Sequence, residues 1–297
     1  MHPTISMDFA YTGSGDGSMH GGKVESSDEK EKLCCLILHC SETGSVHAIP
    51  VNEKKDLANL TGEIVRYIAW LGHGTCIVRY DQEPVLLKLQ KLIVNSRLKS
   101  ELKTLKENPP VHAHASDGLV ENSVQRIRNL SNTLLHYLRE KTGLKFDAKH
   151  PLTAWSWSYA AWLLNRYQSS HGQTSYELLT GHGYNGKIAL YGEPVLAFTY
   201  VAGKPKGIAK WTRGLSLGKS LLNDMHIIAT PERIFLTRAI RRNLSDWADA
   251  TDLYVNFEIS PWRVAGMTGS KLVPDFKPQR IGAEAAPAIA DSYGLPV

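Results

Sequence analysis

Three acidic residues occupy positions from which carboxylates could perform metal chemistry. Asp8 lies in an apolar stretch near the N-terminus, Asp81 directly follows the apolar run CIVRY, and Glu121 opens a long segment with helical periodicity. Three converging carboxylates repel one another, so divalent cations that prefer oxygen ligands would be needed between them. Mg²⁺ or Mn²⁺ held there could activate a nucleophile and stabilise a leaving oxygen in phosphodiester cleavage or transfer.

Spacing alone leaves a simpler interpretation open. The sequence holds 29 acidic residues, and an acidic residue in the first turn of a helix, as expected for Glu121, is favoured by the helix dipole whatever its role. A catalytic role therefore requires that the elements carrying Asp8, Asp81 and Glu121 meet in space.

Hydrophobic patterning predicts the elements that would carry these acids. Dense or alternating apolar runs indicate strands, and apolar residues three and four positions apart indicate helices. The expected strands are 2–10, 33–39, 46–51 and 76–80, and the expected helices are 57–71, 84–98, 116–141, 153–167 and a short turn at 176–179. If the first and fourth strands pair, Asp8 and Asp81 lie close together at one edge of the sheet, and a helix packed across that edge brings Glu121 to them. The segment around 100–110 is expected to be a loop.

The formal net charge of +5 conceals three unlike parts. Residues 1–194 sum to +1, residues 195–242 to +7 and residues 243–297 to −3. Such a local surplus is typical of a surface that binds a polyanion, although a solvated basic surface is the simpler alternative. Short apolar pieces broken by Gly and Pro within 195–242 predict a small β-barrel. Beyond residue 243 the periodicity is lost, and a mostly irregular tail is expected.

Basic residues of this segment are candidates for contacts with DNA phosphates. They surround Trp211, which belongs either to the core of the barrel or to the same surface. The candidates are Lys204, Lys206, Lys210, Arg213, Lys219, Arg241 and Arg242. Binding through phosphates would make the affinity for DNA fall steeply with salt.

Other kinds of site and environment have less support in the sequence. The four cysteines are too few and too adjacent for a disulfide framework, so a reducing, intracellular compartment is expected. No apolar stretch approaches the roughly 18 residues that a membrane helix needs. Structural zinc would require four converging ligands, which neither the cysteines nor the pair His112 and His114 supply. The Gly-rich segment 13–32 lacks the spacing of a nucleotide-binding loop.

Four short motifs occur in a fixed order along the chain. RYDQEP at 79–84 and SDGLVENSVQRI at 116–127 resemble the second-aspartate and glutamate motifs of retroelement integrases. AAWLLNRYQSSHGQTSYELLTG at 160–181 is similar to the segment after the catalytic core, and LYGEPVLAFTY with KWTRGLSLGKS is similar to the short β-module that follows. Together they resemble the integrase of copia-type retrotransposon polyproteins over about residues 8–242.

The resemblance implies an α/β fold. It implies an RNase H-like mixed five-stranded sheet flanked by helices, followed by a small C-terminal β-barrel-like module. The catalytic core would span 1–185 with a loop insertion at 13–32, the basic β-module would span 190–242, and 243–297 would be a mostly irregular tail.

The resemblance also implies a two-metal polynucleotidyl transferase. Carried over residue by residue, the catalytic acids and ligands of Mg²⁺ or Mn²⁺ fall on Asp8, Asp81 and Glu121. Water as the nucleophile would give end processing, and a 3′-hydroxyl would give strand transfer. The expected DNA contacts beside the acids are Ser116, Asn122, Gln125 and Arg128. The expected partners are element ends, target DNA and further copies of the chain, without a membrane, in a cytoplasmic particle first and in the nucleus at the point of action.

Departures from the family pattern bear on activity. Asp81 and Glu121 are separated by 39 residues, slightly more than is usual in the family. The zinc module that precedes the core in the family has no counterpart, and the segment 13–32 directly after Asp8 is unusually long. A polyprotein fragment that binds nucleic acid without catalysis is therefore a second hypothesis. A related nuclease that hydrolyses RNA–DNA hybrids is a third.

Overall fold

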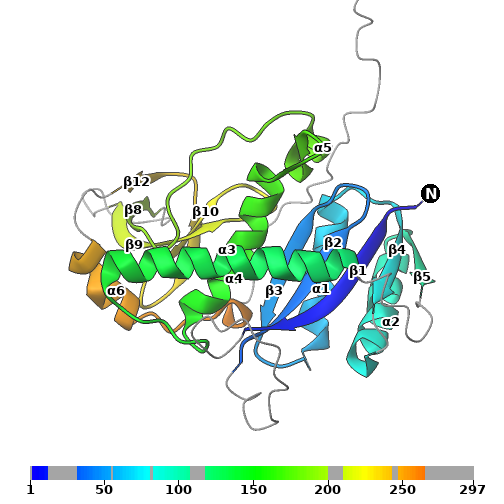
Figure 1. Cartoon of the computed structure of the whole chain (residues 1–297), viewed down its shortest axis with the longest axis horizontal. Coiled ribbons are helices and arrows are strands. Elements are labelled where there is room, and N and C mark those ends of the chain that lie inside the picture. Colours follow the sequence, from blue (N-terminus) through cyan, green and yellow to red (C-terminus); the bar gives the residue numbers. More distant parts are fainter. Residues whose placement is uncertain are drawn as a thin grey trace, which may run out of the picture.

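Two five-stranded β-sheets, a two-stranded sheet of β6 (Ser169–Ser170) and β7 (Gln173–Thr174), and the helices that pack on them make up the computed structural model (Figure 1). The structure describes residues 2–12, 32–54, 56–80, 83–107, 118–199, 210–242 and 247–264. Almost all of the expected loop at 13–32 lies outside these ranges, as do Asp81, Ser116, Lys204 and Lys206.

The first sheet has five strands in the order β3-β2-β1-β4-β5. The strands are β1 (Thr4–Tyr11), β2 (Cys34–Cys40), β3 (Val46–Val51), β4 (Thr75–Tyr80) and β5 (Lys103–Glu107). Helices α1 (Leu57–Trp70) and α2 (Pro84–Leu98) cover one face, and α3 (Gly118–Thr142) and α4 (Pro151–Tyr167) cover the other. β2 runs antiparallel to its neighbours, whereas β1, β4 and β5 run parallel. This order and these directions are those of the RNase H-like fold, so the expected fold class is confirmed.

The fifth strand corrects the sequence prediction, which placed a loop around 100–110. β5 pairs in parallel with β4, and Arg79 of β4 contacts Glu107 of β5 with a nitrogen–oxygen distance of 2.8 Å. β5 lies at the edge of the sheet and has no buried side chain. Its residues therefore show no apolar pattern, and the backbone partner offered by β4 decides the extended conformation.

The second sheet is antiparallel and confirms the expected β-module. Its order is β11-β10-β9-β8-β12. The strands are β8 (Pro194–Phe198), β9 (Trp211–Lys219), β10 (His226–Ala229), β11 (Ile234–Thr237) and β12 (Ile240–Arg242). Only two residues separate β11 from β12, yet the two strands pair at opposite edges, with β10 and β8. The sheet must therefore curl until its edges meet, which gives the barrel-like shape.

One strand of this sheet is longer than the sequence suggests. The expected break at Gly214 does not occur, because Trp211–Lys219 form the continuous strand β9. Gly214 resembles a strand breaker in the sequence, but a Cβ atom there would lie 2.6 Å from the backbone oxygen of Ala229 on β10. The glycine is thus required by the close approach of two strands and does not end either of them.

Part of the segment expected to be a mostly irregular tail forms short helices in the described residues. Residues that follow the second sheet form the 3₁₀-helices η3 (Trp247–Ala250) and η4 (Pro261–Arg263) and the short helix α6 (Thr251–Val255). Leu253, Tyr254 and Phe257 are buried in the core between α3, α4 and the second sheet. Helices this short contain too few residues for a hydrophobic period to be recognised in the sequence. Their apolar side chains are nevertheless packed in the core.

Helix α4 joins the two sheets because apolar side chains cover nearly its whole circumference. Trp157 and Ala160 pack on the first sheet, whereas Trp155, Tyr159 and Trp162 pack toward the second. A helix that is apolar all round is buried between layers, and these tryptophans are core residues. None of the helices within the described ranges is long and apolar enough to cross a membrane.

Candidate active site and nucleic-acid interface

Asp8 lies on β1 at the centre of the first sheet, half-buried and opposite Ile37 of β2. Successive side chains of a strand point to opposite faces. Ala10, two residues further along, belongs to the apolar core that Val120 and Val124 of α3 also join. The carboxyl group of Asp8 is therefore on the side of the sheet that α3 covers.

Strand β4 leads the chain to the position of Asp81. Its last residue, Tyr80, pairs with Met7, the residue immediately before Asp8. Asp81 itself lies outside the described residues. The parallel register nevertheless shows that β4 ends directly beside the middle of β1, as the sequence predicted for the two strands.

Glu121 is exposed in the first turn of α3, which crosses over β1 (Figure 1). Gln125 and Arg128 lie on the same stripe of this helix, because positions four and seven residues apart come nearly into line. Arg128 donates a hydrogen bond of 3.3 Å to the backbone oxygen of Tyr11, the last residue of β1. The stripe that carries Glu121 is thus turned toward the strand that carries Asp8.

Lys54 anchors the chain just beyond the position of Asp81. Its ammonium group donates a hydrogen bond of 2.6 Å to Glu83, which precedes helix α2, and lies 4.5 Å from the centre of the Phe9 ring on β1. Burial alone would lower the pKa of Lys54, but the hydrogen bonds with Glu83 and Tyr11 outweigh it and raise the pKa. The pattern that predicted the acids gave no signal for this lysine.

The acids have the donor set for Mg²⁺ or Mn²⁺, which bind carboxylate oxygens in preference to softer ligands. Among the described residues no group of three His, Cys, Asp or Glu side chains could hold a metal ion, and Asp81 is not among them. Of the three expected metal ligands, the structure describes Asp8 and Glu121.

The expected DNA contacts near Glu121 lie on the exposed side of α3. Asn122 and Gln125 are exposed, and Gln125 donates a hydrogen bond of 2.8 Å to Asn129. Arg128 is half-buried through its bond to β1. Ser116 lies outside the described residues, and the role of these side chains in DNA binding stays a prediction.

Several basic residues of the β-module are already bonded within the chain. Arg213 donates a hydrogen bond of 2.8 Å to the backbone oxygen of Asp249, and Arg242 donates one of 2.6 Å to the buried carboxylate of Glu193. Lys219 is only 8% exposed and contacts Asp224 at 2.6 Å. A DNA phosphate would have to share or displace these partners.

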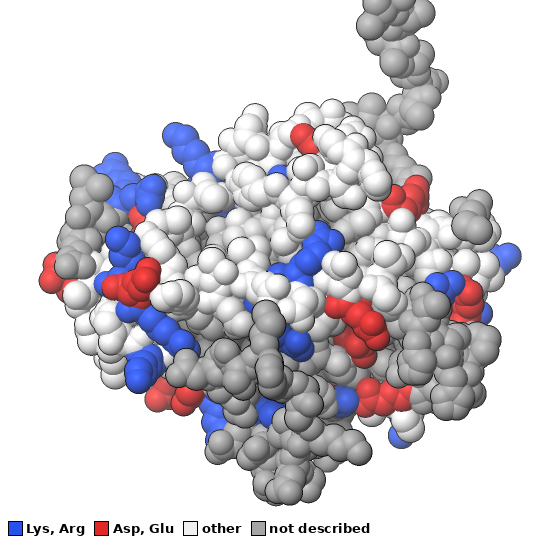
Figure 2. Space-filling view, viewed as in Figure 1, with Lys and Arg blue, Asp and Glu red and all other residues white. Residues whose placement is uncertain are grey.

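Lys210, Arg241 and Arg242 are the exposed ones among the described candidates. The guanidinium of Arg241 lies 4.3 Å from the centre of the Trp211 ring. Strand register places Arg241, Leu196 and Arg213 in one row across β12, β8 and β9, next to the pair formed by Phe198 and Trp211. Figure 2 shows Lys and Arg side chains gathered around this end of the molecule, with acidic side chains among them.

Two motif residues that carried the resemblance have structural partners. Asn165 of α4 accepts a hydrogen bond of 2.8 Å from the backbone N–H of Val46 and donates one of 2.7 Å to its oxygen, which satisfies the outer edge of β3. Arg166 lies over the ring of Trp162 at 4.0 Å and over that of Tyr176 at 5.0 Å. The side chains of Asn165 and Arg166 thus connect α4 to neighbouring elements, so this motif has a structural role.

No family model matches the chain, and no curated protein does. Solved structures do. Retroviral integrases are among these structures. The HTLV-2 integrase catalytic core domain, solved as a trimeric form in complex with magnesium, is 17% identical with a TM-score of 0.40, covering 59% of this chain and 95% of that one. The catalytic core domain of BIV integrase is 15% identical with a TM-score of 0.39, covering 60% and 93%.

A larger match includes the part beyond the first sheet. The simian T-cell lymphotropic virus intasome, solved in complex with the PP2A regulatory subunit B56 gamma, is 14% identical with a TM-score of 0.42, covering 82% of this chain and 78% of that one. These likenesses are weak, and the assignment of the fold rests on the strand order and directions of the first sheet.

Proposed function

We propose that this chain is an integrase-type polynucleotidyl transferase of a copia-like retroelement, which binds DNA and catalyses phosphodiester cleavage and strand transfer. Two independent features support the proposal: four sequence motifs in the family's order, and a first sheet with the RNase H-like strand order. Fold alone does not define activity, since unrelated functions share one fold.

The observation that carries the proposal is the meeting of three elements. β1 holds Asp8 on the face that α3 covers, β4 ends beside the residue before Asp8, and the stripe of Glu121 reaches the end of β1 through Arg128. Elements that contact one another can hold their acids around a common point, which spacing in the sequence could not establish.

In this proposal Asp8, Asp81 and Glu121 hold Mg²⁺ or Mn²⁺ through their carboxylate oxygens. When bound, such ions lower the pKa of an attacking hydroxyl or water and stabilise the charge on the leaving oxygen. Arg128 positions the stripe of Glu121, and Asn122 lies where it could contact the DNA backbone. The resemblance also supports self-association, with element ends and target DNA brought together in the nucleus.

The test is strand transfer with a labelled DNA duplex in Mg²⁺ or Mn²⁺. Glu121→Gln, Asp8→Asn and Asp81→Asn are each expected to abolish product, because each removes a charged metal ligand and keeps the side-chain volume. Glu140→Gln, an exposed carboxylate on the same helix, is the matched control and is expected to retain activity. Full activity in the three acid variants would contradict the proposed site.

The same assay separates the two other hypotheses. DNA binding without metal-dependent turnover in the unaltered chain would identify a non-catalytic remnant. Cleavage restricted to the RNA strand of an RNA–DNA hybrid would identify an RNase H-like nuclease.

A further inference from the structure

A cavity of about 120 Å³ lies where the two sheets meet, away from the proposed catalytic acids. It is bounded by β3, α1, α4, the β9–β10 turn, β11 and η4. An engineered apolar cavity of about 150 Å³ is large enough to bind benzene. The junction cavity, as we call it, is slightly smaller, so one aromatic ring would fill it and a substituent on the ring would lie at its rim.

The walls of the junction cavity are mostly apolar. Trp155 and Trp162 of α4 and Trp262 of η4 contribute indole rings, and Ile227 and Leu236 of the second sheet contribute aliphatic side chains. Rings in such surroundings stack or pack edge to face with a bound aromatic group.

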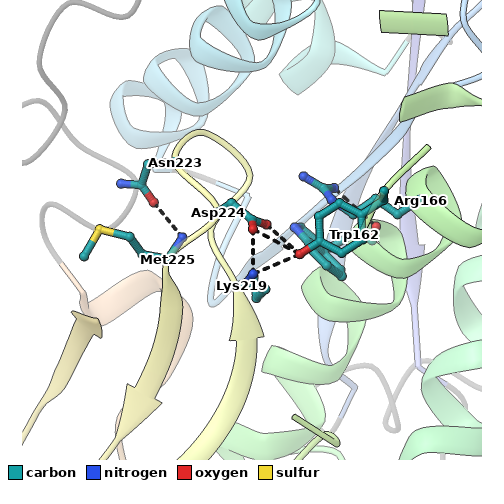
Figure 3. Close-up of polar contacts among 7 residues, drawn as sticks. Trp162, Arg166, Lys219, Asn223, Asp224 and Met225 are labelled. Atoms are coloured by element: carbon teal, nitrogen blue, oxygen red, sulfur yellow. Dashed lines mark hydrogen bonds and ion pairs between the residues drawn. The ribbon is translucent and has the colours of Figure 1, made fainter. Parts of the chain in front are cut away.

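One end of the cavity is polar and cationic (Figure 3). Lys219 lines it, and its ammonium group donates hydrogen bonds of 2.6 Å to Asp224 and 2.9 Å to the hydroxyl oxygen of Tyr184. The Tyr184 hydroxyl in turn donates to Asp224. Asp224 is half-exposed, with a backbone φ of 55°, in the left-handed region that non-glycine residues rarely adopt. The anion that partners Lys219 is thus a half-exposed carboxylate in the turn between β9 and β10.

A second cation lies behind the same wall. The Arg166 guanidinium stacks on Trp162 at 4.0 Å, and its Nε is buried without a hydrogen-bond partner among the described residues. Burial lowers the pKa of Arg166 to about 10, so it remains charged at neutral pH. The buried indole N–H of Trp162 also has no described partner. Two cations and a free donor thus accompany the single carboxylate of Asp224.

The other titratable residues that line the cavity add little negative charge at neutral pH. Glu63 is the only acidic side chain among the described residues that line the cavity, and it is paired with Arg66. Burial raises the pKa of Glu63 to about 8 despite Arg66, so much of it is protonated at neutral pH. Burial lowers the pKa of His47, which also lines the cavity, to about 4. The local charge therefore favours an anion.

We propose that the junction cavity binds a small aromatic carboxylate, with its ring among the three indoles and its carboxylate beside Lys219. The site is separate from the proposed catalytic acids. The proposal does not depend on whether the chain transfers DNA strands. Because α4 and the β9–β10 turn both line it, a bound anion also contacts both sheets.

The probes are benzoate, toluene and benzylammonium, titrated into the full chain and followed by NMR or calorimetry. Benzoate is expected to bind at least about tenfold more tightly than the other two, because only benzoate carries a negative charge that Lys219 can pair with. A factor of ten corresponds to about 1.4 kcal/mol. Equal binding of toluene and benzoate would mean a neutral occupant, such as an aromatic side chain of a protein partner, and would overturn the proposal.

Variants at Ser158 test the location. Ser158 lines the cavity from α4, so Ser158→Leu fills the space and is expected to abolish benzoate binding. Ser158→Ala removes the same hydroxyl without filling the space, and is expected to bind as the unaltered chain does. Should Ser158→Leu fail to fold, Leu222→Trp fills the cavity from the β9–β10 turn. Unchanged benzoate binding in a folded, filled variant would place the ligand elsewhere.

Variants of the cationic end should change affinity in opposite directions. Lys219→Met is expected to weaken benzoate binding about tenfold and to leave toluene binding unchanged. Asp224→Asn removes the competing carboxylate and is expected to strengthen benzoate binding. If both variants moved the affinity in the same direction, the proposed role of Lys219 would be wrong.

Discussion

The guanidinium of Arg128 on α3 donates a hydrogen bond of 3.3 Å to the backbone oxygen of Tyr11 at the end of β1. Through this bond the helix that carries Glu121 is held against the strand that carries Asp8. This long-range contact, together with the burial of Val120 and Val124 in the core, orients the helix about its axis. Any change there should alter the relative position of the two acids.

Arg128→Met is expected to reduce metal-dependent strand transfer by about tenfold, which corresponds to about 1.4 kcal/mol of transition-state stabilisation. The apparent affinity for Mg²⁺ should fall as well, because the stripe of Glu121 loses its anchor. A residue that only contacts a DNA phosphate would instead lower DNA affinity and reduce the salt slope by about 1. Measuring Mg²⁺ dependence and salt dependence separately decides between positioning and DNA contact.

Asn165→Ala should destabilise the fold, because the side chain of Asn165 bonds both the N–H and the oxygen of Val46 on the outer edge of β3. Asn165 is buried, so the two backbone groups would lose their partners where water does not easily replace them. We expect the free energy of unfolding to fall by about 2–4 kcal/mol in urea titrations. Asn129→Ala on the exposed face of α3 is the control, and a loss as small as in that variant would rule out this role.

Glu63 should make stability depend on pH. Burial raises its pKa to about 8 in the folded protein, against an ordinary value of 4.5. The folded chain then binds more protons than the unfolded chain between these pH values, so the contribution of Glu63 is most favourable below pH 4.5 and is lost as the pH rises toward 8.

Glu63→Gln removes this titration. Over the range from pH 5 to pH 8, the unfolding free energy of the unaltered chain should decline relative to that of Glu63→Gln. Urea denaturation of both proteins at several pH values measures the difference, with Glu140→Gln as a control for an exposed carboxylate. A difference that stays constant with pH would mean that Glu63 titrates normally.

Arg241→Met should weaken DNA binding without affecting the fold, because Arg241 is exposed on the ring of Trp211. Loss of one phosphate contact predicts a shallower dependence of affinity on salt, by about 1 in the logarithmic slope. Lys88→Met on α2 removes the same charge from the other part of the molecule and serves as the control. Equal effects of the two substitutions would show that net charge alone governs binding.

Arg213 should behave differently from Arg241 although both are basic residues of the same row. Its guanidinium bonds the backbone oxygen of Asp249 and lies 3.8 Å from Asp252, so it holds the segment after the second sheet. We expect Arg213→Met to lower the unfolding midpoint in thermal denaturation, and Arg241→Met to leave it unchanged. A lower unfolding midpoint in Arg241→Met and an unchanged one in Arg213→Met would contradict the structural role of Arg213.

The sequence by itself determined the elements whose side chains repeat with a clear period. β1, β2, β4 and the long helices bury one or both faces, and burial forces apolar residues to recur every second or every third to fourth position. The strand that carries Asp8 and the helix that carries Glu121 were predicted on that basis. The charge surplus of the β-module was equally visible, since it needs no geometry.

Only the tertiary structure decided what lies at edges and junctions. β5 is extended because β4 offers it a backbone partner, and the segment after residue 247 is ordered because Tyr254 and Phe257 find a core made by distant elements. The surroundings of Lys219 and Arg166 could not be predicted from the sequence either. Their charge is in the sequence, but whether a cation meets solvent, a carboxylate or an aromatic ring depends on elements far apart along the chain, and that proximity is set by packing.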